Sequence, residues 1–535
     1  MPRTTRAFLL LGTIFILIMP TYPLAYAGAS SSPELTQKLY SISQYQLPAG
    51  ASGPAQVASD SVGRIWFVEQ GSNQIGSFDP TTDRVSEFNI PTAKALPEGI
   101  AIDRDGTVWF AELTSNGLGH LFPGNGTIRE VTIPTGTAGL GCGPIGVTPQ
   151  GNGSIWITCE FSNQIDEYVP AEDTIKVFEL PIAFSAPLQI LFDTSGNFWF
   201  AAADAGMLGH ATVNQLRPGT SAGIEEFAPL NNTYVDVIEN PLLPSGHVLT
   251  SLAVPSQLAF SSDGRSLWIS EHGAGSFDRY DISTGSLTKY FTSTPLSSFY
   301  QQSLPNGISV DGSGEVWVAE HYGNRIAEFN PTTGTMTEYP IPCCGPQIAG
   351  TLYLTPGANG TVWFTENSGN ALGELKPIAG SSPIIASVSS NSISLDPHGD
   401  ATVKVEVTPG AGGAGASQTL NFEVAGVTRN GNLMNLTASF QPGNVTIENS
   451  AVTSTLNLQA SGLKPGVYYL TVGGKSSSSG VISSAILEVT VFQGFEIVWV
   501  VAIVAVAAAV AVLLVLLSRR GSRGRLWRGM STGPR

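Results

Sequence analysis

Seven tryptophans recur along the chain in the frame apolar-Trp-apolar, and this repeat limits the possible folds more than any other feature. Successive tryptophans lie 43, 47, 43, 69, 49 and 46 residues apart. Turns rich in Gly, Asn, Asp and Pro separate the apolar segments. A period of about 45 residues built of short strands is typical of a β-propeller. The seven residues are Trp66, Trp109, Trp156, Trp199, Trp268, Trp317 and Trp363.

Other positions recur in register with these tryptophans. A proline stands twelve residues before the tryptophan in five repeats, and an asparagine stands seven residues after it in five. Each unit therefore predicts four short strands, and seven units predict a ring in which each tryptophan packs between neighbouring blades. A glutamate stands three residues after the tryptophan in five repeats: Glu69, Glu112, Glu271, Glu320 and Glu366.

The order of the units predicts how the ring closes. The segment 45–48 (YQLP) matches the last strand of a unit but precedes the first tryptophan, and the seventh unit lacks such a strand. We therefore expect an N-terminal strand to complete the seventh blade of a propeller over residues 44–377. Residues 380–492 lose the tryptophan period and alternate apolar with polar residues, which favours an immunoglobulin-like β-sandwich stalk. The predicted fold class is thus all-β, with one transmembrane helix after the stalk.

Both ends of the chain are predicted to be targeting or anchoring segments. Residues 1–27 combine Arg3 and Arg6, a short apolar run and the segment AYA, which indicates a signal peptide; an uncleaved anchor is the alternative. Residues 497–517 carry no charge over 21 residues, enough for a transmembrane helix, although a buried core helix has the same pattern. Six arginines in residues 518–535 place this tail in the cytoplasm and the body outside the cell membrane.

The charge distribution excludes one class of partner. Without the eight terminal arginines, the remaining 17 basic residues face all 41 acidic ones, a net charge of −24. Binding to nucleic acid needs a basic stripe on the surface, so we expect no nucleic-acid partner.

The repeat also resembles a known family. Segments 97–103 (PEGIAID) and 106–112 (GTVWFAE) are similar to the repeat of the virginiamycin B lyase (streptogramin lyase) family. The resemblance covers about residues 44–377 and implies a seven-bladed propeller. It also implies an enzyme that opens a cyclic antibiotic ester by elimination, using magnesium and histidine.

The catalytic residues that the resemblance implies do not match. The family places its catalytic histidines directly after the recurring proline, a catalytic acid before such a proline, and a magnesium-binding glutamate four residues after a tryptophan. Only Glu160 fits, at the last of these offsets, and no acid precedes a recurring proline. This argues against lyase activity by the family's mechanism. The positions that follow the recurring proline or its equivalent hold Ala55, Glu98, Ile145, Leu188, Ser256, Asn306 and Leu352.

The predicted blades bring several ionisable residues to one rim. The inner strand begins, and the tryptophan strand ends, at the same face, so both contribute to it. The pairs Glu271-His272 and Glu320-His321 are candidate catalytic residues, and Glu271 and Glu320 are candidate ligands of a divalent cation, Mg or Ca. The alternative is that these glutamates are structural elements of the repeat and the histidines are surface residues. The candidate ligand-binding residues of this rim are Glu69, Glu98, Glu112, Glu160, Glu366 and, in an insertion at 231–251, His247.

All four cysteines fall on the same rim. Cys142 and Cys159 lie in one blade, and Cys343 and Cys344 are adjacent in the loop before the seventh. Outside the cell we expect two disulfides. A metal site of four cysteines is the alternative.

These observations favour a membrane-anchored propeller that binds an extracellular ligand, a glycan or an envelope protein at an acidic rim. The alternative is a metal-assisted enzyme acting outside the cell, either a carbon–oxygen lyase or a lactone hydrolase. Calcium-dependent lactonases of the gluconolactonase type also use rim carboxylates in a propeller. The sequence leaves open whether the protein is an enzyme.

Overall fold

The fold is described from a computed structural model. It describes residues 38–48, 50, 52–135, 141–227, 254–273, 275–292, 303–342, 349–381, 383–410, 418–425, 428–429, 432–433, 436–463 and 465–492. Within these ranges no helix is long and apolar enough to cross a membrane. Other predictions fall outside the described residues: the signal peptide 1–27, the span 497–517, the tail 518–535, the insertion with His247, and Cys343 and Cys344.

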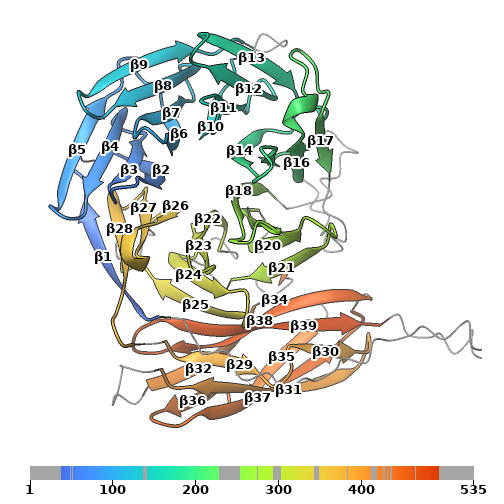
Figure 1. Cartoon of the computed structure of the whole chain (residues 1–535). Coiled ribbons are helices and arrows are strands. Elements are labelled where there is room, and N and C mark those ends of the chain that lie inside the picture. The colour runs from blue at the N-terminus through green and yellow to red at the C-terminus, as the bar shows by residue number, and fades with distance from the viewer. Residues whose placement is uncertain are drawn as a thin grey trace, which may run out of the picture. The chain divides into compact units, whose positions relative to one another are not determined.

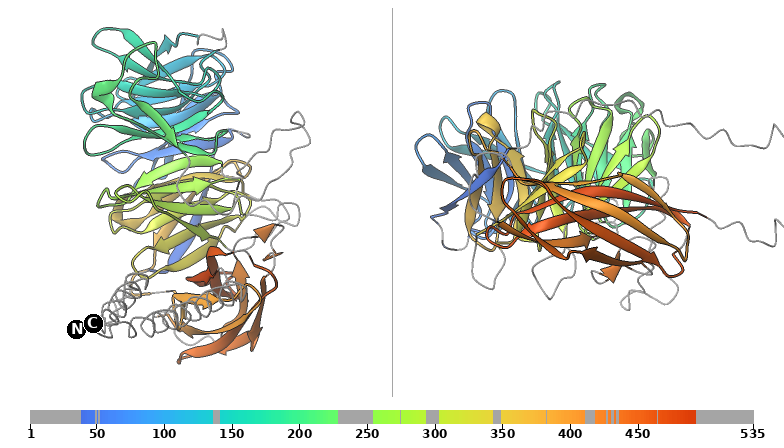
Figure 2. Two further views of the ribbon diagram at one scale, coloured as in Figure 1. Left: turned by 90° about the vertical axis from the view of Figure 1, so that its right-hand side faces the viewer. Right: turned by 90° about the horizontal axis from the view of Figure 1, so that it is seen from below.

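Seven groups of four antiparallel strands surround a common centre, as in a β-propeller (Figure 1). Side views show the strands running between the two faces of the ring (Figure 2). The first three blades are β2 (Pro54–Ser59), β3 (Ile65–Glu69), β4 (Gln74–Asp79), β5 (Arg84–Asn89); β6 (Pro97–Ile102), β7 (Val108–Glu112), β8 (Gly117–Phe122), β9 (Thr127–Thr132); and β10 (Pro144–Pro149), β11 (Ile155–Cys159), β12 (Gln164–Val169), β13 (Thr174–Glu179).

The next three blades repeat this order. In every blade the first strand lies nearest the centre and the fourth lies outermost (Figure 1). They are β14 (Pro187–Phe192), β15 (Phe198–Ala202), β16 (Met207–Ala211), β17 (Ile224–Phe227); β18 (Pro255–Phe260), β19 (Ser266–Glu271), β20 (Ser276–Asp281), β21 (Leu287–Phe291); and β22 (Pro305–Val310), β23 (Val316–Glu320), β24 (Arg325–Asn330), β25 (Thr335–Pro340).

The seventh blade joins the two ends of the propeller. It contains β26 (Thr351–Pro356), β27 (Val362–Glu366) and β28 (Ala371–Pro377), and its outermost strand is the N-terminal β1 (Tyr40–Gln46). β1 pairs antiparallel with β28 over seven residues, from Tyr40 opposite Pro377 to Gln46 opposite Ala371. The structure therefore has the ring closure predicted from segment 45–48. Two short 3-10 turns, η1 (Val213–Gln215) and η2 (Ala358–Gly360), are the helical elements of the described residues.

The recurring tryptophans lie in the interior, each no more than 5% exposed. Trp66 belongs to a cluster with Val108 and Phe110 of the next blade. Trp363 packs against Phe78 of the first blade, with ring centroids 5.3 Å apart. These contacts seal one blade to the next, as the repeat predicts, because each sheet needs an apolar neighbour on both faces.

A large side chain of the tryptophan strand lies opposite a glycine of the next strand in several blades. Phe67 lies opposite Gly76, and a Cβ built on this glycine would stand 2.1 Å from the phenyl ring. Where the tryptophan strand carries isoleucine instead, the opposite residue is aspartate. In the sixth blade the pair is Val318 and Ala327. The same Phe–Gly pairing occurs at Phe110 with Gly119, Phe200 with Gly209, and Phe364 with Gly373.

The strands described between residues 385 and 491 form two packed sheets and a separate two-stranded one, Thr428–Arg429 with Asn432–Leu433. The shared core of the two packed sheets includes Val405 and Leu456 of one sheet with Leu470 and Leu487 of the other, and all four are at most 1% exposed. Sandwich packing of sheets is therefore present, whereas its immunoglobulin-like type stays a prediction. The strands are β29 (Ile385–Val388), β30 (Ser392–Leu395), β31 (Asp400–Thr408), β32 (Gln418–Ala425), β33 (Thr428–Arg429), β34 (Asn432–Leu433), β35 (Leu436–Gln441), β36 (Asn444–Ile447), β37 (Val452–Ala460), β38 (Gly466–Ser476) and β39 (Ile482–Val491).

One of these sheets continues a blade of the propeller. β25 of the sixth blade pairs with β39, from Thr335 opposite Ala485 to Glu338 opposite Ile482. The amide of Ile486 also donates a hydrogen bond to the carbonyl oxygen of Gly334. The sixth blade therefore has a fifth strand, and its outer edge is covered.

Candidate functional site

The start of each inner strand and the end of each tryptophan strand meet at one face of the ring. Pro97 lies opposite Glu112, and Pro255 lies opposite Glu271. We call this face the proline rim and define it by the residue after each strand-opening Pro (Thr351 in the seventh blade) and the residue after each tryptophan strand. The first set is Ala55, Glu98, Ile145, Leu188, Ser256, Asn306 and Leu352, and the second is Gln70, Leu113, Glu160, Ala203, His272, His321 and Asn367.

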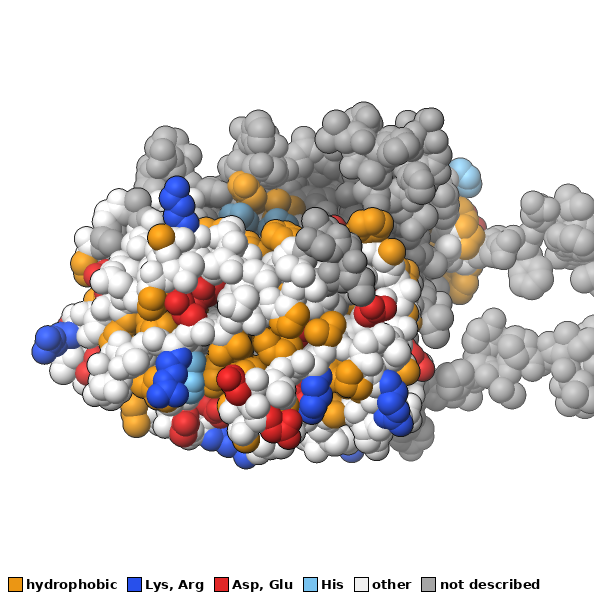
Figure 3. Space-filling model, turned by 90° about the horizontal axis from the view of Figure 1, so that it is seen from above, with side chains coloured by type: hydrophobic (Ala, Val, Ile, Leu, Met, Phe, Trp, Pro, Cys, Tyr) orange, Lys and Arg blue, Asp and Glu red, His pale blue; other side chains and the backbone are white. Residues whose placement is uncertain are grey.

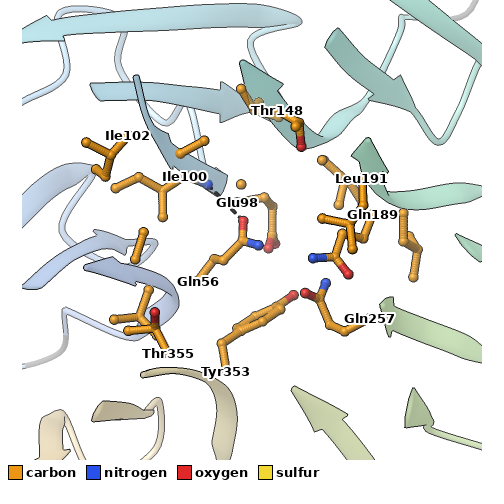
Figure 4. A pocket seen from close by; sticks show the side chains of 18 of the residues that line it. Gln56, Glu98, Ile100, Ile102, Thr148, Gln189, Leu191, Gln257, Tyr353 and Thr355 are labelled. Atoms are coloured by element: carbon orange, nitrogen blue, oxygen red, sulfur yellow. Dashed lines mark hydrogen bonds between the residues drawn. The ribbon is translucent and has the colours of Figure 1, made fainter. Parts of the chain in front are cut away.

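The inner strands enclose a cavity of about 310 Å³ at the centre of the ring. Long polar side chains from five blades point into it: Gln56 from β2, Glu98 from β6, Gln189 from β14, Gln257 from β18 and Tyr353 from β26 (Figure 4). This volume is at the lower end of the range for small-molecule sites. The cavity therefore offers amide, carboxyl and phenol groups that can hydrogen-bond a polar ligand.

Two of these glutamines also connect neighbouring inner strands. The side-chain oxygen of Gln56 accepts a hydrogen bond from the amide of Ile100, at 2.8 Å. That of Gln189 accepts one from the amide of Leu258. Each inner strand has a register shift just after its opening residue, which leaves such amides without a partner in their own sheet. Within the described part of the chain, the hydrogen bonds of Gln257 involve its backbone, so its side-chain amide is available to a ligand.

Glycine occupies the equivalent position in the other three blades. A Cβ on Gly99 would stand 2.0 Å from the carbonyl oxygen of Ile145, and one on Gly146 would stand 2.2 Å from that of Leu188. A Cβ on Gly307 would stand 2.8 Å from the Cα of Tyr353. Close approach of the inner strands therefore limits side chains at this position to four of the seven blades.

Glu98 lines the cavity, and its carboxyl group interacts with a second one, Glu160, which in turn interacts with Asp204. Burial raises the pKa of Glu98 to about 7, with a further increase from the charge of Glu160. The pKa of Glu160 is itself raised by burial and by the charge of Asp204. Glu98 Oε1 accepts a hydrogen bond of 2.5 Å from Gln70 Nε2. At neutral pH this carboxyl group is therefore close to its titration midpoint, as a proton donor or acceptor in a site would be.

The recurring glutamates lie inside the blades. Glu69 and Glu320 are 0% exposed, and Glu112 and Glu366 are 1% exposed. Glu69 accepts a hydrogen bond from the hydroxyl of Ser72, three residues later. These four carboxyl groups lie beneath the turn that follows the tryptophan strand and do not line an open rim.

The recurring glutamates of other blades have different interaction partners. Glu112 accepts a hydrogen bond from the hydroxyl of Ser115 at 2.6 Å. Both oxygens of Glu366 accept from Gln44 Nε2 of the N-terminal strand, at 2.8 Å. Glu271, 6% exposed, lies beside the buried ion pair of Lys289 with Asp278. These contacts match the structural alternative considered for the repeat glutamates.

The predicted carboxylate site for a cation is not assembled. Within the described residues, one group of three possible metal ligands has its donor atoms close together: Cys142, Cys159 and Asp166. Its two sulfur atoms are joined in a disulfide, so they are not available as thiolate ligands. Glu271 and Glu320 each point into their own blade and do not join the histidines in such a group.

The magnesium chemistry implied by the family resemblance does not fit either. No histidine follows an opening residue of the inner strands. Glu160 has the matching offset, but within the described residues it does not belong to a close group of three possible metal ligands. We therefore derive no reaction step through magnesium.

The two candidate catalytic histidines do meet. His272 Nε2 lies 3.3 Å from His321 Nδ1, and the ring centroids are 5.7 Å apart. Burial lowers the pKa of both imidazoles, and the neighbouring His272 contributes to the pKa of about 4 for His321. Both rings are therefore neutral at pH 7.

One predicted disulfide is present. Cys142 and Cys159 are joined, with their Cα atoms 4.6 Å apart, and both are fully buried. The bridge ties the loop before β10 to the end of β11. Cys343 and Cys344 lie outside the described residues, so their pairing stays a prediction.

The cavity residues Gln56, Gln189, Gln257 and Tyr353 were not among the predicted site residues. Their signal in the sequence is positional, since each stands two residues after the opening of an inner strand, where three other blades have glycine. A long polar side chain at a position that otherwise needs glycine marks a blade that contributes to the channel. Of the predicted rim carboxyls, Glu98 lines the cavity, and Glu160 lies near enough for its charge to raise the pKa of Glu98.

The side of the ring seen in Figure 3 carries charges of both signs. Over the outer strands β9 and β13, acidic and basic side chains are interspersed with apolar ones (Figure 3). The carboxyl groups near the channel thus contrast with the mixed charges on this side of the ring.

Comparisons with known proteins agree with this fold. Residues 36–220 match the virginiamycin B lyase family, and residues 189–358 match the SMP-30/gluconolactonase/LRE-like region. A streptogramin B lyase structure is 25% identical with a TM-score of 0.52, over 63% of this chain and 98% of that chain. Virginiamycin B lyase from Staphylococcus aureus is 23% identical with a TM-score of 0.51, over 64% and 100% respectively. No curated protein matches the chain. The propeller of this chain is therefore similar to the propellers of the virginiamycin B lyase family.

Proposed function

We propose that the chain is a membrane-anchored binding protein with its propeller outside the cell. The central cavity of the propeller binds an uncharged polar ligand, and a glycan is the preferred candidate. The observation that carries the proposal is the convergence of Gln56, Gln189, Gln257, Tyr353 and Glu98 on one cavity. Amides and hydroxyls recognise sugar hydroxyls by hydrogen bonds and leave charged ligands uncompensated. The predicted signal peptide and membrane span support the location.

A glycan array probed with the full chain in detergent tests this function. We expect binding to uncharged oligosaccharides that Gln257→Ala and Tyr353→Phe each weaken about tenfold, because one lost hydrogen bond to a ligand costs about 1.5 kcal/mol. Gln74→Ala is the matched control, since Gln74 bonds Asn89 on an exposed strand away from the cavity. Absence of binding to any uncharged oligosaccharide would rule out this ligand class.

A second candidate, an extracellular lyase or lactone hydrolase, is favoured by one observation. The proline rim carries both the neutral His272–His321 pair and Glu98, whose pKa of about 7 suits acid–base catalysis. Against it, the predicted metal ligands Glu271 and Glu320 are buried away from this pair. Incubation with quinupristin, present in a structure of a similar virginiamycin B lyase, and with simple lactones tests it. Ring opening that His321→Ala abolishes would establish an enzyme.

A further inference from the structure

Two histidines from different blades face each other on the proline rim. His272 directly follows β19 and His321 directly follows β23, and 49 residues separate them in the sequence. Their nearest nitrogens, Nε2 of His272 and Nδ1 of His321, are 3.3 Å apart, with the ring planes inclined by 35°. The two histidines therefore meet only because the fold brings the ends of these two strands together.

The backbone holds both residues in place. The amide of His272 donates a hydrogen bond to the carbonyl oxygen of Val254 at 3.0 Å, and that of His321 donates to Leu304 at 3.2 Å. The residue before each histidine is a buried glutamate. Each histidine thus has a fixed starting point at a strand end, and rigid strand ends position a site more accurately than free loops.

The distance between the two nitrogens fits two ligands of one metal ion. In a tetrahedral site with metal–nitrogen bonds of about 2.05 Å, two ligand nitrogens lie about 3.3 Å apart. The contact is also a hydrogen bond between the two rings, and it is longer than the length of about 2.9–3.0 Å most common for N–H···O bonds. The observed 3.3 Å agrees with the tetrahedral arrangement.

The ligand chemistry selects the class of metal. Both imidazoles are half-buried, and burial favours the neutral form, which has a free lone pair for a metal. The adjoining carboxyl groups of Glu271 and Glu320 are buried in their blades and do not add oxygen ligands. Imidazole without carboxylate suits Cu²⁺, Ni²⁺ and Zn²⁺, whereas Mg²⁺ and Ca²⁺ require oxygen.

We propose that His272 and His321 together bind one divalent late transition metal ion, with Cu²⁺ bound most tightly, and that water fills its remaining positions. This site is independent of the glycan-binding proposal, because none of the five cavity side chains is a ligand. The sequence predicted that Glu271 and Glu320 bind Mg²⁺ or Ca²⁺ through oxygen atoms. The proposed site instead uses two imidazole nitrogens and binds a softer ion.

The test is a titration of the full chain in detergent, stripped with a chelator, with CuCl₂, ZnCl₂, MgCl₂ and CaCl₂ in turn, followed by calorimetry. We expect one equivalent of Cu²⁺ and of Zn²⁺, and no saturable binding of Mg²⁺ or Ca²⁺ at the pair. His272→Ala and His321→Ala should each weaken Cu²⁺ binding at least tenfold. His398→Ala is the matched control, because His398 is an exposed histidine of the sandwich, and it should leave binding unchanged.

Two further measurements keep the result interpretable. His272→Asn and His321→Asn preserve a polar side chain of similar length, and circular dichroism shows whether each variant is folded. Electron paramagnetic resonance of the Cu²⁺-loaded protein should show coupling to two equivalent imidazole nitrogens, reduced to one in each folded variant. Unchanged Cu²⁺ affinity in both folded His variants, or no saturable binding by the unaltered chain, would overturn the proposal.

Discussion

Phe110 on β7 lies directly opposite Gly119 on β8, and its ring fills the space that a side chain at position 119 would need. A Cβ on this glycine would stand 2.0 Å from Cζ of the phenyl ring. Four blades share this pairing, and the blades without a phenylalanine have no glycine there. The two positions are therefore determined together within a blade.

Replacement of Gly119 by alanine should destabilise the propeller. The added methyl group would overlap the ring of Phe110, and overpacking of this kind costs about 1–3 kcal/mol. Urea denaturation of the variant measures the loss in the free energy of unfolding. Gly124→Ala is the control, since a Cβ there meets no atom within 4 Å, and it should be nearly neutral.

The combination Phe110→Val with Gly119→Ala should recover part of that loss. It reproduces the Val318–Ala327 pair of the sixth blade. We expect the double variant to be at least about 1 kcal/mol more stable than the sum of the single effects predicts, as residues in contact are coupled. Strict additivity of the two changes would contradict the proposed pairing.

The contact between the N-terminal strand and the seventh blade can be tested at Gln44. Its amide donates to both oxygens of Glu366, which is 1% exposed. Gln44→Leu would leave a buried carboxyl without this donor, at a cost of about 1–3 kcal/mol, and would raise the pKa of Glu366 further above its usual range. Ser43→Ala, on the same strand, should change the unfolding free energy by less than about 0.5 kcal/mol.

Loss of the Cys142–Cys159 bridge should lower stability by about 3 kcal/mol, the value expected for a closed loop of this length. The double variant Cys142→Ala/Cys159→Ala measures this loss by thermal unfolding. Because other cysteines remain in the chain, the effect of a reductant on the melting temperature should be clearly smaller in the double variant than in the unaltered protein. An equal effect in both would show that a different bridge carries the stabilisation.

The buried glutamates should make stability depend on pH. Burial raises the pKa of Glu69 and Glu112 from 4.5 to about 7, so the folded chain keeps protons that the unfolded chain releases. Their contribution to the free energy of unfolding is therefore greatest below about pH 4.5 and falls as the pH rises to about 7. Four histidines with lowered pKa values act in the opposite direction over part of this window.

The test therefore compares how the free energy of unfolding depends on pH in two proteins. Urea denaturation at pH 5, 6, 7 and 8 compares the unaltered chain with Glu69→Gln/Glu112→Gln. The double variant should lose stability less steeply between pH 5 and 7, because amides do not titrate. Parallel curves for the two proteins would show that these carboxyl groups are not the buried acids described.

The repeat arithmetic predicted the ring well because tryptophan burial and the turn residues are set within each unit. Trp66 and its six equivalents lie between blades, and segment 45–48 closes the last blade. For Glu69 and Glu112 a structural role was predicted beside a place on the ligand-binding rim, and neither prediction named their side-chain partners. The signal for these partners was a serine three residues later, whose hydroxyl bonds the carboxyl group.

Contacts between distant segments account for what the sequence did not reveal. The meeting of Gln257 with Tyr353 in the channel depends on the ring bringing the fifth and seventh blades together. The pairing of β25 with β39 uses backbone groups, which leave no side-chain pattern. The approach of His272 to His321 likewise depends on adjacent strand ends, although the equal offsets of the two residues from their tryptophans hinted at it.

The pairing of β1 with β28 also has a consequence for synthesis of the chain. Tyr40 leaves the ribosome more than three hundred residues before its partner Pro377. Throughout that interval the earliest strand has no place in a sheet, and the blades already made form an open arc with apolar faces at both ends. Among the described strands, the first to be translated is thus among the last to be incorporated, and a nascent chain that stops between residues 363 and 371 has every repeated tryptophan but no closed ring.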